Sequence, residues 1–274
     1  MQSWFERLLR AAVPALALGV AACGNATPEP PPDELSDPGP QDASFDGALS
    51  FDGVDDYVSI GTARMPQIQR DQTLMLWFLP KASKVAAADE LQTMFSLHRA
   101  GWSGIALALR GGITLITSVY SKKDLATAAT AVTLDQWHHA AVLLNRESTE
   151  LFIDGVSVAT GEAPGQNRTP IEAYLGSADG YHQLFHGLLD EVQVYPRSFS
   201  PEEIAEVARG VRADAADAPV LYLSFNEARG ARCYDRSGLG NHAELGDGVV
   251  SLMPAREKSE VPNEPRVAPA MPAP

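Results

Sequence analysis

The sequence predicts an all-β protein, an antiparallel sandwich with one short helix. Between residues 48 and 225, short runs rich in branched and aromatic side chains alternate with turns of Gly, Pro, Asn and Asp, which is the pattern of many short strands. Asp154-Gly155 separates two of these runs by two residues, and Gly111-Gly112 separates two others. Both spacings favour tight hairpins and therefore antiparallel pairing.

The expected strands are all short and bordered by turn residues, and they cover residues 48–52, 56–60, 73–79, 93–98, 104–109, 113–120, 136–144, 150–153, 156–159, 171–175, 184–194 and 220–225. One helix is expected over residues 201–209. Ser200 can accept a hydrogen bond from the N–H of Glu203 while the Glu203 carboxylate reaches back, and Pro201 suits the first helical position.

The expected strand 184–194 carries two adjacent acids, Asp190 and Glu191. A retaining glycosidase needs two carboxyl groups about 5 Å apart, and two residues of one strand share a face only at alternate positions. Adjacent residues are expected to point to opposite sides, and the positions expected to share a face with Asp190 are Leu188, Val192 and Val194. No second acid completes a pair, so we expect no catalytic residues and no enzyme.

Residues 1–22 have the pattern of an export signal, because Arg7 and Arg10 precede a short apolar run over residues 11–19. That run is too short to span a bilayer. The next residues, Val20-Ala21-Ala22-Cys23, resemble the lipobox of bacterial lipoproteins, which implies lipidation at Cys23. An ordinary secretory signal cleaved nearby is the alternative. Gly24 rather than Asp after the cysteine implies an outer-membrane lipoprotein of the cell envelope.

Two flanking segments are expected to be unstructured. Residues 23–43 form an acidic, Pro-rich linker, and residues 251–274 form a second Pro-rich tail. The remaining 44–250 are long enough for one domain. The net charge of -14 disfavours nucleic acid as a partner. With Cys23 lipidated, Cys233 is left without a disulfide partner and is interpreted as a small buried residue.

Four segments in order resemble the signatures of laminin-G-like, concanavalin A-like jelly-roll domains of the lectin and glucanase type. They are Ala48-Leu49-Ser50-Phe51-Asp52-Gly53-Val54-Asp55-Asp56-Tyr57-Val58, Gln136-Trp137-His138-His139-Ala140-Ala141-Val142, Leu151-Phe152-Ile153-Asp154-Gly155 and the segment 187–204. The resemblance implies a jelly-roll sandwich. It leaves function open, because domains of this fold bind sugars or proteins and some are glycosidases.

The segment 218–250 resembles the motif that ordinarily opens such a domain, but here it comes last. It contains Leu221-Tyr222-Leu223-Ser224-Phe225 followed by Asp235-Arg236-Ser237-Gly238-Leu239-Gly240-Asn241. A permuted terminal strand that completes the sheet is the favoured interpretation, since sandwich termini lie close together. A truncated second repeat is the alternative.

Calcium is the metal that the resemblance implies. In calcium-binding relatives the Asp-x-Ser-Gly-x-Gly-Asn stretch lies near a metal, which nominates Asp235 and Asn241, with Asp190 as a partner. The alternative is that Asp235 and Asn241 only brace a turn through hydrogen bonds to the backbone. Asp55 and Asp56 are interpreted as turn residues.

Two aromatic residues are candidates for contact with a ligand. Trp102 stands between glycines in an expected loop, and Tyr181 lies in the turn-rich stretch Asp179-Gly180-Tyr181-His182. An exposed ring can stack on the face of a sugar. The alternative is that both rings pack at the edge of the core.

These features together predict a non-catalytic lipoprotein of the cell envelope whose lectin-like module binds a glycan or a surface protein. The alternatives are a structural envelope protein without a ligand and, behind it, a glycoside hydrolase.

Overall fold

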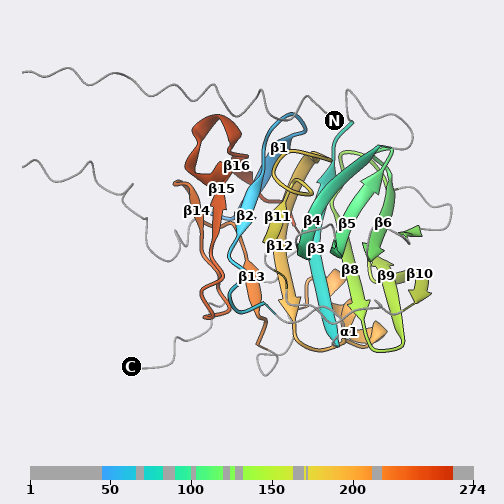
Figure 1. Cartoon of the computed structure of the whole chain (residues 1–274). Coiled ribbons are helices and arrows are strands. Elements are labelled where there is room, and N and C mark those ends of the chain that lie inside the picture. The colour runs from blue at the N-terminus through green and yellow to red at the C-terminus, as the bar shows by residue number, and fades with distance from the viewer. Residues whose placement is uncertain are drawn as a thin grey trace, which may run out of the picture. The chain divides into compact units, whose positions relative to one another are not determined.

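A computed structural model shows two antiparallel sheets packed face to face, with one α-helix (Figure 1). The structure describes residues 45–65, 71–82, 90–99, 103–119, 124–126, 132–162, 170, 172–211 and 218–261. The predicted fold class, an antiparallel jelly-roll sandwich with one short helix, is confirmed. Within these ranges, no helix is both long and apolar enough to cross a membrane.

The first sheet, sheet A, has the strand order β10-β9-β8-β3-β12-β1-β16, and β13 also pairs with β12. Its strands are β1 (Gly47–Asp52), β3 (Gln72–Pro80), β8 (His138–Leu144), β9 (Ser148–Ile153), β10 (Val156–Glu162), β12 (His186–Tyr195), β13 (Leu221–Leu223) and β16 (Ala255–Lys258). Asp154 and Gly155 join β9 to β10 with φ of 50° and 80°. Both values are positive, as the predicted two-residue hairpin requires.

The second sheet, sheet B, has the order β14-β15-β2-β11-β4-β5-β6-β7. Its strands are β2 (Val58–Ile60), β4 (Leu91–Arg99), β5 (Ser103–Arg110), β6 (Thr114–Val119), β7 (Asp124–Ala126), β11 (Glu172–Leu175), β14 (Arg232–Cys233) and β15 (Ala243–Leu245). Two short 3₁₀ turns follow β15, namely η1 (Gly246–Gly248) and η2 (Val250–Leu252).

The main core fills the space between the sheets, and most strands contribute side chains from alternate positions to it. On β3, for example, Leu74, Leu76 and Phe78 face this core. Met75 points to the other face of sheet A, where a smaller cluster packs beneath the helix α1 (Pro201–Ala208). The predicted capping box is present, because Ser200 accepts from the N–H of Glu203 and the Ser200 N–H donates to the Glu203 carboxylate.

Strand β12 contains a β-bulge at the two acids. Asp190 lies opposite Trp77 of β3 and Gln193 lies opposite Met75, so two residues of β12 lie opposite one residue of β3 between these pairs. Glu191 has a φ of 50°, in the left-handed region. The bulge lies where the second neighbour of β12 changes from β1 to β13, since β1 pairs with residues 186–189 and β13 with residues 192–194.

The bulge overturns the predicted alternation of faces around Asp190 and Glu191. Leu189, Val192 and Val194 all belong to the main core. Strict alternation would have placed Val192 and Val194 on the same side as Asp190, and the extra residue shifts the register between them. The two acids are therefore not separated onto opposite faces in the way that a regular strand would require.

The C-terminal segment completes both sheets. β13 pairs with β12 of sheet A, and β15 pairs with β2 of sheet B. This arrangement is the one that the permutation hypothesis requires, although the origin of the segment order stays a prediction. The predicted tail boundary at residue 251 is wrong, because β16 pairs with β1 from Gly47↔Lys258 to Ser50↔Ala255. The edge of β1 supplies the hydrogen bonds that order these residues.

A buried ion network joins β16 to the turn between β13 and β14. The Glu227 carboxylate accepts from Arg236 Nη2 at 2.9 Å and lies 3.6 Å from Arg256 Nη1. Arg256 also donates to the carbonyl oxygens of Gly230 and Arg232. Burial raises the pKa of Glu227, and the two guanidinium groups lower it by less. Because Glu227 is buried, it depends on both cations.

Replacing Arg256 with methionine should reduce the free energy of unfolding by about 2–4 kcal/mol, because the change leaves a buried carboxylate with one cation. The Arg256 side chain is 9% exposed. Lys258→Met on the same strand is the matched control, and it should change stability by less than about 0.5 kcal/mol because Lys258 is exposed. Urea denaturation measures both values. Equal effects of the two variants would show that β16 is not anchored by the ion network.

Candidate functional site

Tyr181 is the most exposed aromatic side chain among the described residues, with 76% of its surface open to solvent. It lies in the loop 176–185 that joins β11 to β12. The loop begins at Gly176, which has a φ of 73° and lies so close to Phe51 that a Cβ atom would come within 2.2 Å of the ring. Ser96 of β4 donates to the carbonyl oxygens of Ser177 and Ala178. The loop therefore folds back over the outer face of sheet B.

Two polar side chains make the loop rigid. Asp179 accepts from the N–H groups of Tyr181 and His182, and its second oxygen lies 2.8 Å from His182 Nδ1. Ser177 accepts from the N–H groups of Asp179 and Gly180 and donates to the His182 carbonyl. Burial raises the pKa of Asp179, but these hydrogen bonds lower it by more, so Asp179 stays ionised. These hydrogen bonds hold the loop in a shape that leaves the Tyr181 ring exposed to solvent.

Three tyrosines gather at this end of sheet B, and we call Tyr57, Tyr174 and Tyr181 the tyrosine cluster. The Tyr57 ring lies 6.2 Å from the Tyr174 ring and 6.4 Å from the Tyr181 ring, between centroids. Tyr57 is buried, Tyr174 is half-buried and Tyr181 is exposed. Exposure to solvent therefore increases from Tyr57 through Tyr174 to Tyr181, and only the rings of Tyr174 and Tyr181 are accessible within the cluster.

Asp247 of η1 links the tyrosine cluster to β2. One carboxylate oxygen accepts from Tyr57 Oη at 2.9 Å and the other from Ser59 Oγ at 2.5 Å. Burial and the Asp247 bond raise the pKa of Tyr57 to about 12, so its hydroxyl remains a donor. The Gly246 N–H donates to the Tyr57 carbonyl and the Tyr57 N–H to the Leu252 carbonyl. Two loops and the 3₁₀ turns therefore meet at Tyr57.

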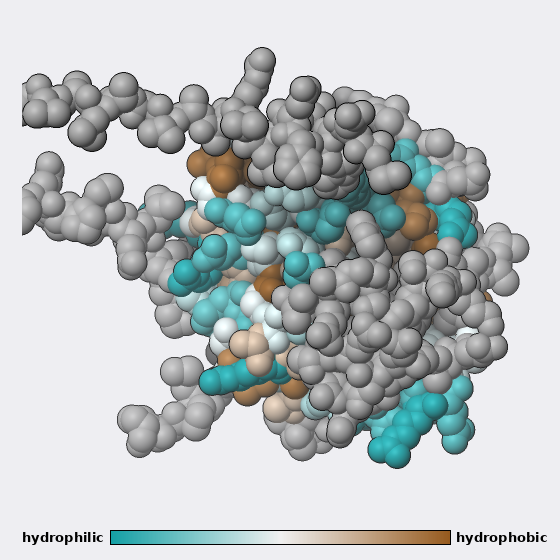
Figure 2. Space-filling model, viewed as in Figure 1, coloured by the Kyte–Doolittle hydropathy of each residue, from teal (hydrophilic) through white to brown (hydrophobic). Residues whose placement is uncertain are grey.

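A polar row crosses the outer face of sheet B beside this cluster. Arg232 pairs with Glu244, Glu244 with Ser59, and Ser59 with Tyr174 in successive strand registers. Cross-strand partners share a face, and the residues that flank them, such as Val58 and Leu245, belong to the core. In Figure 2 hydrophilic colours dominate the surface in the region where Figure 1 places β14 and β15.

An open groove of about 410 Å³ runs along this row, lined by Ser59, Ile60, Gly61, Arg232, Gly240, His242 and Glu244. Arg232 and Glu244 form an ion pair at 3.1 Å, and each side chain is about half exposed. His242 Nδ1 accepts from the backbone N–H of Asp235 at 3.0 Å. An imidazole that accepts at Nδ1 carries its proton at Nε2. His242 therefore has an N–H donor left for a ligand.

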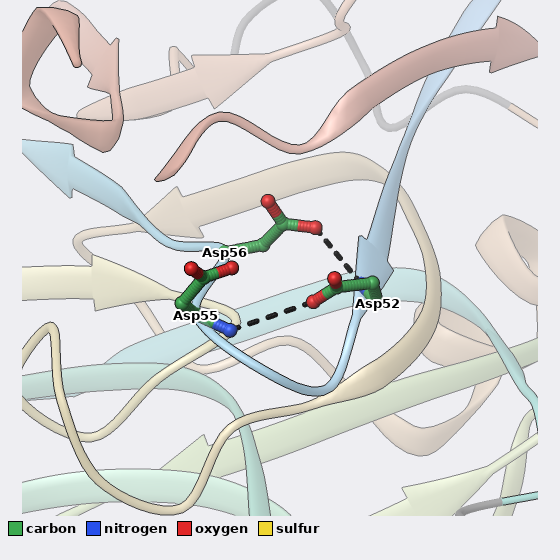
Figure 3. A group of neighbouring side chains, drawn as sticks. All are labelled: Asp52, Asp55 and Asp56. Carbon is green, nitrogen blue, oxygen red and sulfur yellow. Dashed lines mark hydrogen bonds between the residues drawn. The ribbon is translucent and has the colours of Figure 1, made fainter. Parts of the chain in front are cut away.

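Three carboxylates lie close together in the turn between β1 and β2. The oxygens of Asp52, Asp55 and Asp56 are within 4.8 Å of one another, and no other set of three acid, His or Cys ligands this close occurs in the described ranges (Figure 3). Asp52 accepts from the Val54 N–H, and Asp56 accepts from the Asp52 N–H. Asp56 therefore has the turn-bracing role that the sequence predicts, and Asp55 donates to Asp52 through its N–H. Carboxylate oxygens also suit a hard cation.

Burial raises the pKa of Asp56 to about 6, and the neighbouring charges of Asp52 and Asp55 add to this rise. The bond from the Asp52 N–H acts in the opposite direction. Asp56 is thus the group of this turn that changes charge nearest to neutral pH.

The structure brings Asp235 and Asn241 together, as the predicted calcium site requires. Hydrogen bonds from the protein, however, already occupy their side-chain oxygens. The Asp235 carboxylate accepts from the N–H groups of Tyr222, Ser237 and Asn241 and from Ser237 Oγ. Asn241 accepts from the Arg64 N–H and donates to the Val220 carbonyl. These bonds match the turn-bracing alternative. A cation at Asp235 would have to displace them, so the donor set does not fit a metal.

Asp190, the third predicted metal ligand, is fully buried and has different partners. Its carboxylate accepts from the Glu191 N–H at 2.7 Å and from Ser259 Oγ. Glu191 accepts from Tyr222 Oη at 2.9 Å. Both acids of the β12 bulge thus hold the C-terminal segment, and neither lines the groove. The predicted ligand contact Trp102 and the predicted lipidation site Cys23 lie outside the described residues.

The sequence reasoning found Tyr181 but missed Tyr57, Tyr174, Asp247 and the groove. In the sequences of β2 and β11, apolar residues flank Ser59 and Tyr174 on both sides. This alternation predicts that the two side chains face outward, so the sequence did contain a signal for them. Asp247 gave no signal, because its partners lie nearly 190 residues away in the chain.

A family comparison agrees with this architecture. The model of the concanavalin A-like lectin/glucanases superfamily matches residues 52–205, which is more than half of the chain. The chain belongs to this superfamily. The match includes the acid turn, Tyr57, Tyr174 and Tyr181, whereas the part of this concanavalin A-like domain that follows residue 205 lies beyond it. Among curated proteins no match is found.

Three solved structures are similar to this chain at low sequence identity. A Bacteroides ovatus protein, provisionally described as carbohydrate-binding, aligns with a TM-score of 0.57 and 13% identity over 81% of this chain and 62% of its own. This chain therefore spans less than two thirds of that relative's length. A heptameric pentraxin from Limulus polyphemus has a TM-score of 0.47 and 15% identity over 60% and 82% of the two chains. Domain 4 of an extracellular arabinanase from Geobacillus stearothermophilus, solved with arabinotriose, has a TM-score of 0.47 and 18% identity over 59% and 76%.

Asp56→Asn should stabilise the metal-free protein at pH 7.5, because the change removes a charge that burial and the neighbouring carboxylates disfavour. The gain should be about 1 kcal/mol, since solvent screens part of the repulsion. Asparagine keeps an acceptor for the Asp52 N–H. A raised folded pKa means that stability is present below the unfolded pKa and is lost as the pH rises through about 6. The gain should therefore shrink between pH 6 and pH 4. Urea denaturation in chelator measures it, and a gain that does not vary with pH would contradict the burial argument.

Proposed function

We propose that this protein is a non-catalytic, lipid-anchored lectin of the bacterial cell envelope that binds a glycan at the tyrosine cluster. The observation that carries the proposal is the Tyr181 ring, 76% exposed on a loop that Ser177 and Asp179 brace. A ligand that covers an exposed aromatic ring gains free energy by removing apolar surface from water. A loop that is already braced loses little conformational entropy when the ligand binds. A sugar face is a flat partner of the right size.

Several observations support this proposal. The chain has the concanavalin A-like lectin fold, and the Bacteroides ovatus protein of the same fold is provisionally described as carbohydrate-binding. Polar groups lie near the accessible rings, since Asp179 accepts from the Tyr181 N–H and Ser59 is the cross-strand partner of Tyr174. Binding sites for sugars combine an apolar surface with a few placed polar groups. A surface protein is the alternative partner, and it would need a larger apolar area than Tyr181 offers.

The absence of catalysis is part of the proposal. Asp190 and Glu191 are buried and hold Ser259 and Tyr222, so they have structural partners in place of a substrate. A glycoside hydrolase would need two carboxyl groups facing a sugar bond in a cleft. In the groove of the described domain, Glu244 is the one carboxylate among the lining residues.

Tyr181→Ala should weaken glycan binding at least about tenfold, as expected when a central aromatic contact is truncated. Tyr181→Phe keeps the ring and should bind nearly as well as the parent protein. A glycan array with the domain 44–261, run with and without calcium, identifies the ligand, and calorimetry measures the affinities.

Val156→Ala is the matched control, because Val156 is also exposed but lies at the β9–β10 hairpin. It should leave binding unchanged. Failure of the parent protein to bind any glycan would refute the lectin proposal. Binding that survives Tyr181→Ala would refute the assignment of the site.

Cys23→Ala should release the protein from the membrane fraction, because the lipid chains attached at this residue supply the anchor. Fractionation of cells and mass spectrometry of the mature N-terminus check this expectation. The parent protein should carry an acylated cysteine as its first residue. An unmodified N-terminus elsewhere near residue 23 would instead support the ordinary secretory signal.

A further inference from the structure

We propose that the groove over β2, β14 and β15 is a hydroxyl-binding subsite that extends the tyrosine cluster, so that the protein prefers neutral oligosaccharides to single sugars. The inference rests on the proposed glycan-binding function and adds the length and the charge class of the ligand. It is carried by the position of the groove, by its polar groups and by the part of the chain that builds it.

The groove and the tyrosine cluster are parts of one surface. Ser59 lines the groove and is also the cross-strand partner of Tyr174. Asp247 bonds both Ser59 Oγ and Tyr57 Oη, and the Tyr57 ring touches the Tyr181 ring. A ligand stacked on Tyr181 or Tyr174 can therefore continue into the groove, provided that it is longer than one sugar.

The polar groups of the groove suit adjacent hydroxyl groups. Arg232 supplies donors and Glu244 supplies acceptors side by side at 3.1 Å. A vicinal diol can accept from the first and donate to the second. His242 adds a donor at Nε2, because its Nδ1 already accepts from the Asp235 N–H. Arg232 and Glu244 have opposite charges that cancel, and Asp247 lies beside Ser59. An anionic sugar would be repelled more than a neutral one.

The groove is built mainly by residues outside the family match. Arg232, Gly240, His242 and Glu244 come from the C-terminal segment, whereas the superfamily model ends at residue 205. Ser59, Ile60 and Gly61 of β2 and its following turn provide the other side. The subsite therefore depends on the C-terminal segment, which the family match does not reach.

Variants in the groove test binding without disturbing the fold. The Arg232–Glu244 pair is about half exposed, and such pairs contribute little to stability. Glu244→Gln keeps the shape and removes the charge. His242→Asn keeps an acceptor near the Nδ1 position for the Asp235 N–H and removes the Nε2–H donor. Glu257→Gln is the matched control, since Glu257 is an exposed acid on β16 of the other sheet.

The probes are neutral gluco-, manno-, galacto- and arabino-oligosaccharides graded from monosaccharide to hexasaccharide, with oligo-uronic acids as the anionic series. Titrations followed by NMR measure affinities down to the millimolar range. The parent protein should bind at least one neutral series more tightly as its length grows. Glu244→Gln and His242→Asn should each lose about threefold to tenfold on the long members, as one lost hydrogen bond implies, and nothing on the monosaccharide.

The outcomes separate the two proposals. Tyr181→Ala should weaken binding at every length, whereas Glu257→Gln should change nothing. If the parent protein binds glycans but the groove variants match it at every length, or lose affinity equally for monosaccharides, the subsite is refuted and the lectin proposal stands. Equal or tighter binding of the oligo-uronic acids refutes the preference for neutral ligands. Binding of no probe refutes the proposed function and, with it, the subsite.

Discussion

The β-bulge at Asp190 and Glu191 is the constraint on which the rest of the domain depends. A regular strand has one neighbour on each side, but β12 pairs with β3 on one side and with both β1 and β13 on the other. The extra residue lets β12 change neighbours at this point while Leu189, Val192 and Val194 remain in the core. β13 joins sheet A directly after this point, where β1 no longer pairs with β12.

The two acids of the bulge are explained by this role. Asp190 accepts from the Glu191 N–H inside the bulge and from Ser259 beyond β16. Glu191 accepts from Tyr222 of β13. Buried carboxylates are costly unless they are hydrogen-bonded, and here the bonds join β12 to β13 and to the residue that follows β16. The two adjacent acids of this strand thus have a structural role.

The strands, the hairpin at Asp154-Gly155 and the capping box at Ser200 could be predicted, because each depends on neighbours within a few residues. The bulge could not, since its cause is the arrival of a strand about thirty residues later in the chain. Tyr181 was predicted from its turn-rich surroundings. Tyr57, Asp247 and the groove escaped prediction because they meet only through long-range register. The short strands β14, β15 and β16 carry too few residues to show a periodic pattern.

The pairing of β1 with β16 has a consequence for how the chain is made. Among the described strands β1 is synthesised first, yet its neighbours on both sides, β12 and β16, come much later in the chain. One edge of β2 stays open until β15 has emerged, and one edge of β1 stays open until β16 has emerged, and open edges are sites of aggregation. Sheet A can therefore be completed only when almost the whole length of the domain is available.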